Sequence, residues 1–208
     1  IRDGKFSIVP ESEVGGDSVG HRLLQGAGYP IQVPTIDIVE VGAGGGSIAT
    51  VDAAGGFQVG PRSAGAVPGP VGYALGGDQP TVTDANLVLG YLNPVALGGG
   101  NLPLDEKGAR AALTDLGARI NLSDTDTAYG VHLIANANMM RALSSVSSER
   151  GVDPSGLTLV AIGGSGGIHA VGLAESLGIR RLLVPPTAGL FSALSLLFAD
   201  LEHHLVRA

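Results

Sequence analysis

The spacing of apolar residues in the first part of the chain predicts a hairpin built around a run of glycines. β-Branched residues lie on both sides of residues 42–47, which indicates that this glycine loop joins two strands. A turn at residues 53–56 and the apolar segment 57–59 then predict a return strand. We expect the hairpin to span residues 36–60 and the preceding residues, 1–33, to form an irregular lead-in.

Helical spacing dominates the middle of the chain. Apolar residues three and four positions apart predict helices over residues 87–92, 105–116 and 123–151, within a helical region at 84–150. Residues 157–207 then read as strand, helix, strand, helix and a final strand. Because strand, helix, strand at this spacing forms a crossover between parallel strands, the sequence predicts an α/β fold.

Composition limits the classes of function. No segment of the 208 residues approaches the roughly 20 apolar residues of a membrane span. The absence of cysteine excludes disulfides and thiol catalysis and favours a cytoplasmic location. A net charge of −7 without a basic cluster argues against nucleic-acid binding. Glycine supplies 34 residues, in clusters between apolar segments, so the glycines mark loops and close approaches of the backbone.

Two glycine loops are candidate binding elements. The loop at residues 42–47 has no lysine and leads into a strand, which excludes a Walker-type loop and a dinucleotide fingerprint. Its successive glycines can turn their N–H groups toward one anion, but they also suit a plain hairpin turn. The loop at residues 163–167 follows a predicted parallel strand, at the end where ligands bind in such sheets. Its backbone can lie flat against a planar ring such as adenine.

Several polar side chains in the predicted helices have both a structural and a functional interpretation. Asp84, like Thr83, can cap the helix that begins near it, or it can present a carboxylate to a ligand. Asn136 and Asn138 lie in the middle of the long helix, where a buried hydrogen bond or a polar pocket lining would explain them. We expect His132 to pack or to face solvent, and not to bind a metal.

Six segments together resemble the hydantoinase A, 5-oxoprolinase and acetone carboxylase family of the actin-like ATPase superfamily. They cover almost everything from Val33 onward, and they read IDIVEVGAGGGSIATVD, VGPRSAGAVPGPVGYALGG, QPTVTDANLVLGYLNP, IANANMMRALSSVSSERGVDP, LVAIGGSGGIHAVGLAESLGI and LLVPPTAGLFSALSLLFAD. The resemblance implies an actin-like, ribonuclease H-like domain over residues 34–208, with a mixed sheet and flanking helices. It also implies the carboxyl-terminal portion of a longer protein, as does a start at Ile1 without methionine.

This resemblance implies ATP-dependent opening of a cyclic amide or imide, of the hydantoin or 5-oxoproline type, through phosphorylation of a carbonyl oxygen. By position, phosphate would be held by Gly42, Gly44, Gly45, Gly46 and Ser47, and adenosine would be contacted by Gly163, Gly164, Ser165 and Gly166. Asp37 and Asp84 would act through Mg²⁺ or orient water, and His169 would lie near the nucleotide as a further catalytic residue. A second, hydantoinase B-like subunit is the implied partner.

Two departures from the family pattern leave alternatives open. Val67 stands where the family usually has an aspartate, and the superfamily's first phosphate loop, Asp-x-Gly-Gly-Thr, is absent from these 208 residues. Half of a phosphate site should hydrolyse ATP poorly, because phosphoryl transfer depends on positioning and charge neutralisation from both sides. The alternatives are an ATP-dependent carboxylase subunit and a non-catalytic nucleotide-binding or assembly module. A nicotinamide-dependent oxidoreductase fits the loops least well.

Overall fold

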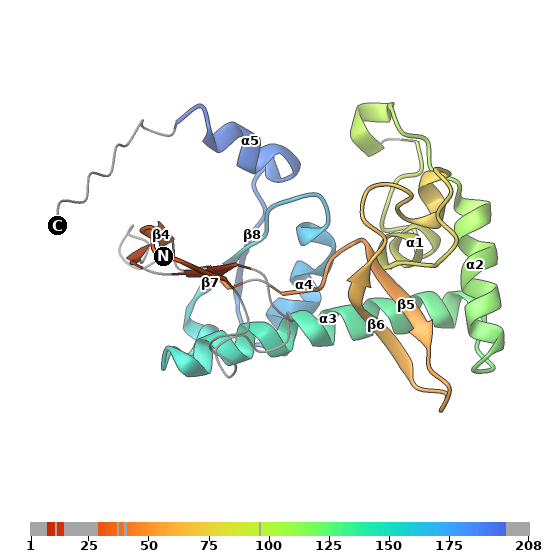
Figure 1. Cartoon of the computed structure of the whole chain (residues 1–208), viewed down its shortest axis with the longest axis horizontal. Helices are drawn as coiled ribbons and strands as arrows, with labels where there is room; N and C mark the ends of the chain where they lie inside the picture. The colour runs from red at the N-terminus through yellow and green to blue at the C-terminus, as the bar shows by residue number, and fades with distance from the viewer. Residues whose placement is uncertain are drawn as a thin grey trace. The chain divides into compact units, whose positions relative to one another are not determined.

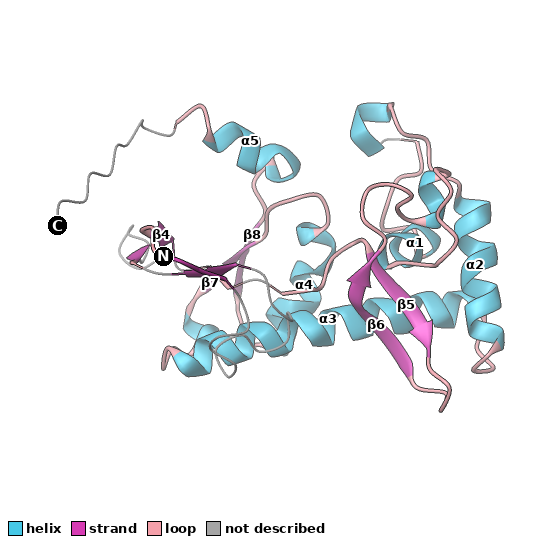
Figure 2. Cartoon of the chain, viewed as in Figure 1, coloured by secondary structure: helices cyan, strands magenta, loops and turns pink. Residues whose placement is uncertain are grey.

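The computed structural model describes residues 8–10, 12–14, 29–36, 38–39, 41–95 and 97–198. The chain divides into two compact units, Ile1–Val152 and Asp153–Ala208. Figure 1 shows the elements coloured along the chain, from red at the N-terminus to blue at the C-terminus. Short strands and longer helices make up both units, so the predicted α/β class is confirmed (Figure 2).

The described residues of the first unit form three antiparallel strand pairs. They are β1 (Ile8–Val9) with β4 (Thr35–Ile36), β2 (Ser12–Val14) with β3 (Tyr29–Ile31), and β5 (Ser47–Val51) with β6 (Phe57–Ser63). The β5–β6 pair confirms the predicted turn and return strand, but the hairpin begins at Ser47 and ends at Ser63. Its turn is closed by Asp52, whose Oδ1 accepts the N–H groups of Ala54 and Gly56 at 2.9 and 2.7 Å. β6 runs beyond the predicted segment, through Pro61, which is possible because a two-stranded sheet leaves one edge of each strand unpaired.

The strand predicted before the glycine loop is not seen among the residues described there. Of these residues Thr35 and Ile36 are in a strand, while Ile38, Val39 and Val41 are exposed and irregular. β-Branched composition favours a strand only where a partner edge is available, and the described residues offer none there. For the same reason the described residues form four two-stranded sheets in place of the expected mixed sheet. The predicted lead-in contributes β1, β2 and β3.

Three helices follow the hairpin: α1 (Val82–Val88), α2 (Glu106–Ala118) and α3 (Asp124–Glu149). The predictions for α2 and α3 are confirmed, with Asp105 and Ser123 as their N-caps. The prediction for α1 is wrong, because this helix begins five residues before Leu87 and ends at Val88. Its N-cap is Thr81. Thr81 and Asp84 form a capping box, which starts the helix earlier than the apolar pattern indicates. Short 3₁₀ turns precede α1 at η1 (Val71–Tyr73) and α2 at η2 (Leu97–Gly100).

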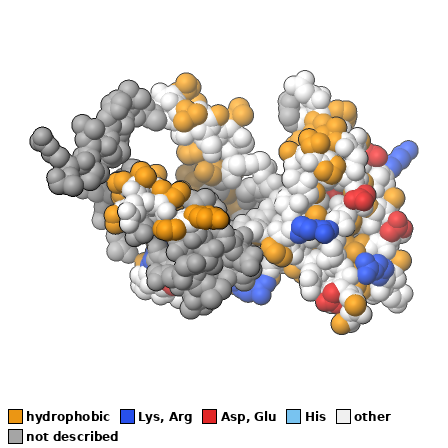
Figure 3. All heavy atoms as spheres, in the orientation of Figure 1, with side chains coloured by type: hydrophobic (Ala, Val, Ile, Leu, Met, Phe, Trp, Pro, Cys, Tyr) orange, Lys and Arg blue, Asp and Glu red, His pale blue; other side chains and the backbone are white. Residues whose placement is uncertain are grey.

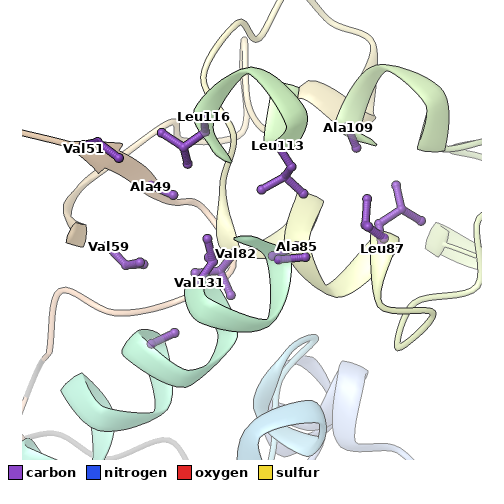
Figure 4. Close-up of a cluster of buried hydrophobic side chains, with 13 residues drawn as sticks. Ala49, Val51, Val59, Val82, Ala85, Leu87, Ala109, Leu113, Leu116 and Val131 are labelled. Atoms are coloured by element: carbon purple, nitrogen blue, oxygen red, sulfur yellow. The ribbon is translucent and has the colours of Figure 1, made fainter. Parts of the chain in front are cut away.

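One cluster of buried apolar side chains joins the hairpin to the three helices (Figure 4). Its members are Ala49, Val51 and Val59 from the hairpin, Val82, Ala85, Leu87 and Val88 from α1, Ala109, Leu113 and Leu116 from α2, and Ala128, Val131 and Ala135 from α3. In α2 and α3 these residues recur every three or four positions, which places them on one face. All seven residues of α1 are buried. This helix is therefore enclosed by the hairpin, α2 and α3.

The second unit confirms the predicted crossover. β7 (Thr158–Val160), α4 (Gly166–Ser176) and β8 (Arg181–Leu183) follow one another, and the two strands pair in parallel, with Leu159 opposite Leu182. Ala170, Leu173 and Ala174 form the buried face of α4. The 3₁₀ turn η3 (Pro154–Gly156) precedes β7, and η4 (Ala188–Leu190) follows β8. The second helix predicted in this region is the short α5 (Phe191–Ser195). The predicted final strand lies outside the described residues.

Charged side chains of both signs are interspersed on the first unit in the face shown in Figure 3. Arg110 of α2 forms ion pairs with Glu106 on its own helix, at 3.0 Å, and with Asp124 of α3, at 2.6 Å. The guanidinium lowers the pKa of Asp124 through this hydrogen bond. Among the helices that the structure describes, none is both long and apolar enough to cross a bilayer.

Candidate functional site

The glycine loop at residues 42–47 is held in place mainly by its carbonyl groups. The carbonyl of Gly44 accepts the N–H of Ser47 at 3.0 Å, and the carbonyl of Gly46 accepts the N–H of Ala64 at 2.9 Å. Ser47 is buried, and its Oγ accepts the N–H of Gly44 at 3.0 Å. The carbonyl of Gly45 points to the start of α1.

Two N–H groups of this loop face away from those contacts. None of the residues that the structure describes accepts a hydrogen bond from the N–H of Gly45 or of Gly46. A trans peptide places its C=O and N–H on opposite sides. Because the carbonyls of Gly44 and Gly45 are engaged within the protein, the N–H groups that share their peptides point the other way. Adjacent backbone N–H groups without an acceptor can bind an anion when both point toward it.

Asp84 is a fully buried carboxylate that accepts four hydrogen bonds. Its Oδ1 accepts the N–H of Gly72 at 2.7 Å, and its Oδ2 accepts the N–H of Val71 at 3.2 Å. The N–H and the hydroxyl of Thr81 also donate to Oδ2, both at 2.8 Å. The negative charge lies in the first turn of α1, where the helix dipole favours it. The prediction that Asp84 caps the helix as its N-cap is wrong, because Thr81 is the N-cap and Asp84 is its N3 partner in the capping box. The proposed metal or catalytic role of Asp84 stays a prediction.

His132 and Asn136 of α3 form a buried polar chain with Asn86 of α1. The Nδ1 of His132 lies 2.9 Å from Oδ1 of Asn86, and its Nε2 lies 3.1 Å from Nδ2 of Asn136. A neutral imidazole that donates from Nδ1 and accepts at Nε2 satisfies both contacts. The ring of Tyr91 meets the imidazole edge-on, with centroids 5.2 Å apart. His132 therefore packs, as predicted.

The other asparagine of α3 has a separate partner. Nδ2 of Asn138 donates to the carbonyl of Val59 in β6 at 3.0 Å. This contact ties α3 to the hairpin. Hydrogen bonding within the fold thus explains both asparagines, and neither needs a pocket to account for its place in the helix.

The second glycine loop leads from β7 into α4. Gly163 has a φ of +85°, which only glycine adopts readily, and its N–H donates to the carbonyl of Ala188 at 2.8 Å. At Gly164, by contrast, a Cβ would meet no heavy atom within 4 Å. The fold does not require glycine at that position, whereas close approach of a flat ligand to the backbone would. Ser165 is the N-cap of α4 and makes no side-chain capping bond, so it leaves the first N–H groups of the helix uncapped by that side chain.

The predicted catalytic residues that the structure describes are buried, each within its own unit. His169 is 1% exposed, in the early part of α4, and Asp84 is buried in the other unit. Asp37 lies outside the described residues. The part of the chain that the structure describes holds no group of three or more His, Cys, Asp or Glu residues arranged for a metal ion. The catalytic and metal roles of these residues stay predictions, as do the ligand contacts of both loops.

Thr83 was assigned only a possible capping role by the sequence, and the structure gives it another. Its N–H and its hydroxyl both donate to the carbonyl of Gly45, at 2.8 and 2.9 Å. The pattern from Thr81 to Asp84, a threonine followed three residues later by an acid, is a capping-box signal that fixes the start of α1. It could have identified Thr83 as a first-turn residue, but not its contact 38 positions earlier in the chain.

Comparison with known proteins identifies the family. The model of the hydantoinase/oxoprolinase family matches residues 1–205. An uncharacterized protein of Methanocaldococcus jannaschii is 48% identical over 193 residues, which are 93% of this chain and 28% of that protein. The chain belongs to the hydantoinase/oxoprolinase family, so the resemblance seen in the sequence is confirmed.

Two solved structures are similar to the chain. The ATP-dependent caprolactamase from Pseudomonas jessenii has a TM-score of 0.67 and 44% identity, over 77% of this chain and 23% of that one. The nucleotide-free structure of acetone carboxylase has a TM-score of 0.76 and 30% identity, over 91% of this chain and 25% of that one. The chain thus spans about a quarter of the length of these relatives.

We expect Asp84→Asn to lower the free energy of unfolding by roughly 2–4 kcal/mol, because an amide cannot accept all four hydrogen bonds and leaves buried donors unpaired. Urea unfolding without nucleotide or metal measures this loss. Asp115→Asn, at an exposed position of α2, is the matched control and should stay within about 0.5 kcal/mol of the wild type. Equal stability of the two variants would contradict the structural role of Asp84.

The stability of the protein should also depend on His132. Burial lowers the pKa of His132 below its usual value of 6.5. At pH values between the lowered pKa of the folded chain and about 6.5, the unfolded chain therefore binds more protons than the folded chain. The contribution of the neutral imidazole is fully present above about pH 6.5 and is lost as the pH falls toward the folded pKa.

Urea unfolding across this pH range measures that loss. The difference in free energy of unfolding between wild type and the non-titrating variant His132→Gln should narrow as the pH falls. Titration of the imidazole resonances by NMR provides the second readout. A midpoint for His132 at or above its usual value, or a difference that does not change with pH, would show that the ring is not held neutral by burial.

Proposed function

We propose that this chain is the nucleotide-binding part of an ATP-dependent hydrolase that opens a cyclic amide or imide of the hydantoin or 5-oxoproline type. The observation that carries the proposal is the pair of outward N–H groups at Gly45 and Gly46, in a chain that belongs to the hydantoinase/oxoprolinase family. The similar caprolactamase is described as ATP-dependent. An actin-like ATPase fold is part of the same proposal.

In this proposal the two glycine loops have different roles. The loop at residues 42–47 binds phosphate oxygens through its backbone N–H groups, with the buried Ser47 fixing its shape. The loop at residues 163–166 receives the adenosine, because the backbone at Gly164 is open to a flat ring. Each loop belongs to its own unit, and each contributes a binding surface that the fold alone does not explain.

ATP, when bound, supplies the phosphoryl group that makes an amide carbonyl susceptible to water. The residues of this chain bind and orient the phosphates through N–H groups, which suit an anion without a proton transfer. The described residues hold no group of three or more His, Cys, Asp or Glu arranged for a magnesium ion, and the buried carboxylate of Asp84 already accepts four hydrogen bonds, so its role toward magnesium stays a prediction. We derive no step through Mg²⁺. Asp37 and His169 keep the roles that the family resemblance implies.

A carboxylase subunit is the second candidate function. The acetone carboxylase structure covers more of this chain, at a higher TM-score, than the caprolactamase structure does. Such an enzyme would use the same ATP chemistry on a ketone. A non-catalytic nucleotide-binding module is the third possibility, since Val67, in place of a carboxylate, is an exposed apolar side chain. In either enzyme a second subunit would complete the assembly.

Turnover of ATP by the full-length protein, with its partner subunit, tests the proposal. We expect hydantoin, 5-oxoproline or a related lactam to stimulate the release of ADP, together with opening of the ring. A requirement for bicarbonate and a ketone would establish the carboxylase instead. Binding of ATP without turnover, with any of these substrates, would leave the non-catalytic module.

The variant Gly164→Val tests the adenosine loop. We expect the affinity of the full-length protein for ATP to fall by roughly 10- to 100-fold, because the new side chain occupies the space that the ring needs. The smaller variant Gly164→Ala should leave thermal unfolding unchanged, since a Cβ at this position meets nothing within 4 Å. Gly156→Val is the matched control. Gly156 is equally open but precedes β7, at the opposite end of the strand. Calorimetric affinities that fall equally in both variants would refute a specific role for Gly164.

A further inference from the structure

We propose that Thr83 is a positioning residue that orients the phosphate-facing N–H groups of the first glycine loop. The inference rests on the proposed function, because it assumes that phosphate binds at that loop. Thr83 is the second residue of α1 and is 6% exposed, so its side chain is directed into the protein. It does not touch the ligand. It acts through the carbonyl of Gly45.

The contact between Thr83 and Gly45 is a double one. The N–H of Thr83 donates to the carbonyl oxygen at 2.8 Å, and its Oγ1 donates to the same oxygen at 2.9 Å. The N–H bond also serves the helix, because a first-turn N–H has no partner within the helix itself. The hydroxyl bond is different. The helix does not need it, and its effect on this chain is to fix the direction of the Gly45 carbonyl.

The direction of that carbonyl determines the direction of a neighbouring donor. Gly45 C=O and Gly46 N–H belong to one planar trans peptide, so a carbonyl held toward α1 holds the N–H away from it. Three consecutive glycines, 44–46, have no side chains to restrict rotation of their peptide planes. An external contact is therefore needed to keep the donors in one orientation. Thr83 supplies this contact to the central glycine.

Thr83 lies in a segment, the start of α1, whose own conformation is fixed by hydrogen bonds. Thr81 and Asp84, on either side of it, are fully buried and form the capping box. The segment before the helix is bonded to β5, where the N–H of Ala49 donates to the carbonyl of Pro80 at 2.8 Å. A binding group is best positioned by elements whose own conformations are locked in this way. The start of α1 meets that requirement.

Two substitutions in the full-length protein test the inference. Thr83→Val removes the hydroxyl but keeps the N–H and the branched shape, whereas Thr83→Ser keeps the hydroxyl. Calorimetry with ATP, ADP and adenosine reports binding with and without phosphates. For Thr83→Val we expect the affinity for ATP and ADP to fall roughly 3- to 10-fold, while Thr83→Ser stays within about twofold of the wild type. The affinity for adenosine should not change in either variant.

The outcomes separate this inference from the proposed function. If the wild-type protein binds none of these nucleotides, the proposed function fails, and the role of Thr83 fails with it. If the wild type binds ATP and Thr83→Val binds it equally well, only the role of Thr83 is overturned. Equal losses for adenosine and ATP in Thr83→Val would mean that the substitution disturbs the fold in general, which also overturns the inference.

Discussion

The first unit depends on the burial of one carboxylate. An ionised group removed from water is costly unless hydrogen bonds replace those of the solvent. The carboxylate of Asp84 accepts such hydrogen bonds from Thr81, Val71 and Gly72. These donors come from the start of α1 and from the turn η1, so the two segments must be in place together. The capping box sets the first turn of α1, and the next contact along that turn, from Thr83, reaches the glycine loop.

Glycines of this chain occur for different physical reasons. Gly60 and Gly163 have φ values of +69° and +85°, which other residues adopt only with strain, so the course of the backbone explains them. Gly44 and Gly164, like Gly156 and Gly189, have open space where a side chain would be. At these positions the backbone itself is available for contact. Gly44 and Gly164 lie in the loops that we assign to the nucleotide, whereas Gly156 and Gly189 do not.

How far the sequence predicts the structure depends on whether a signal is local. The helices α2 and α3 were predictable, because their apolar faces and their caps, Asp105 and Ser123, lie within the same few residues. The boundaries of α1 were missed. A helix buried on every side has no polar face to define its length. The parallel pair of β7 and β8 was predictable from the length of the crossover.

Longer-range features of the candidate site could not be predicted in this way. The two glycine loops are visible in the sequence, but the orientation of their peptides is not. At the first loop it is set by Thr83, which lies 38 residues further along the chain. The strand predicted before this loop is an error of a different kind, because the sequence predicts a strand that the described residues do not form. Ile38, Val39 and Val41 have the right composition, but a strand also needs a neighbour, and the sequence of one segment does not reveal whether it has one.

The distance in sequence between Gly45 and Thr83 also sets an order of events during synthesis. A chain that leaves the ribosome from its amino terminus exposes the glycine loop well before α1 has been made. The hairpin turn at Asp52 can close locally. The Gly45 carbonyl, however, receives its hydrogen bonds from Thr83 only after residues 81–84 have been synthesised and have formed their capping box. The glycine loop therefore acquires its shape late, and only in a chain that has already completed the start of its central helix.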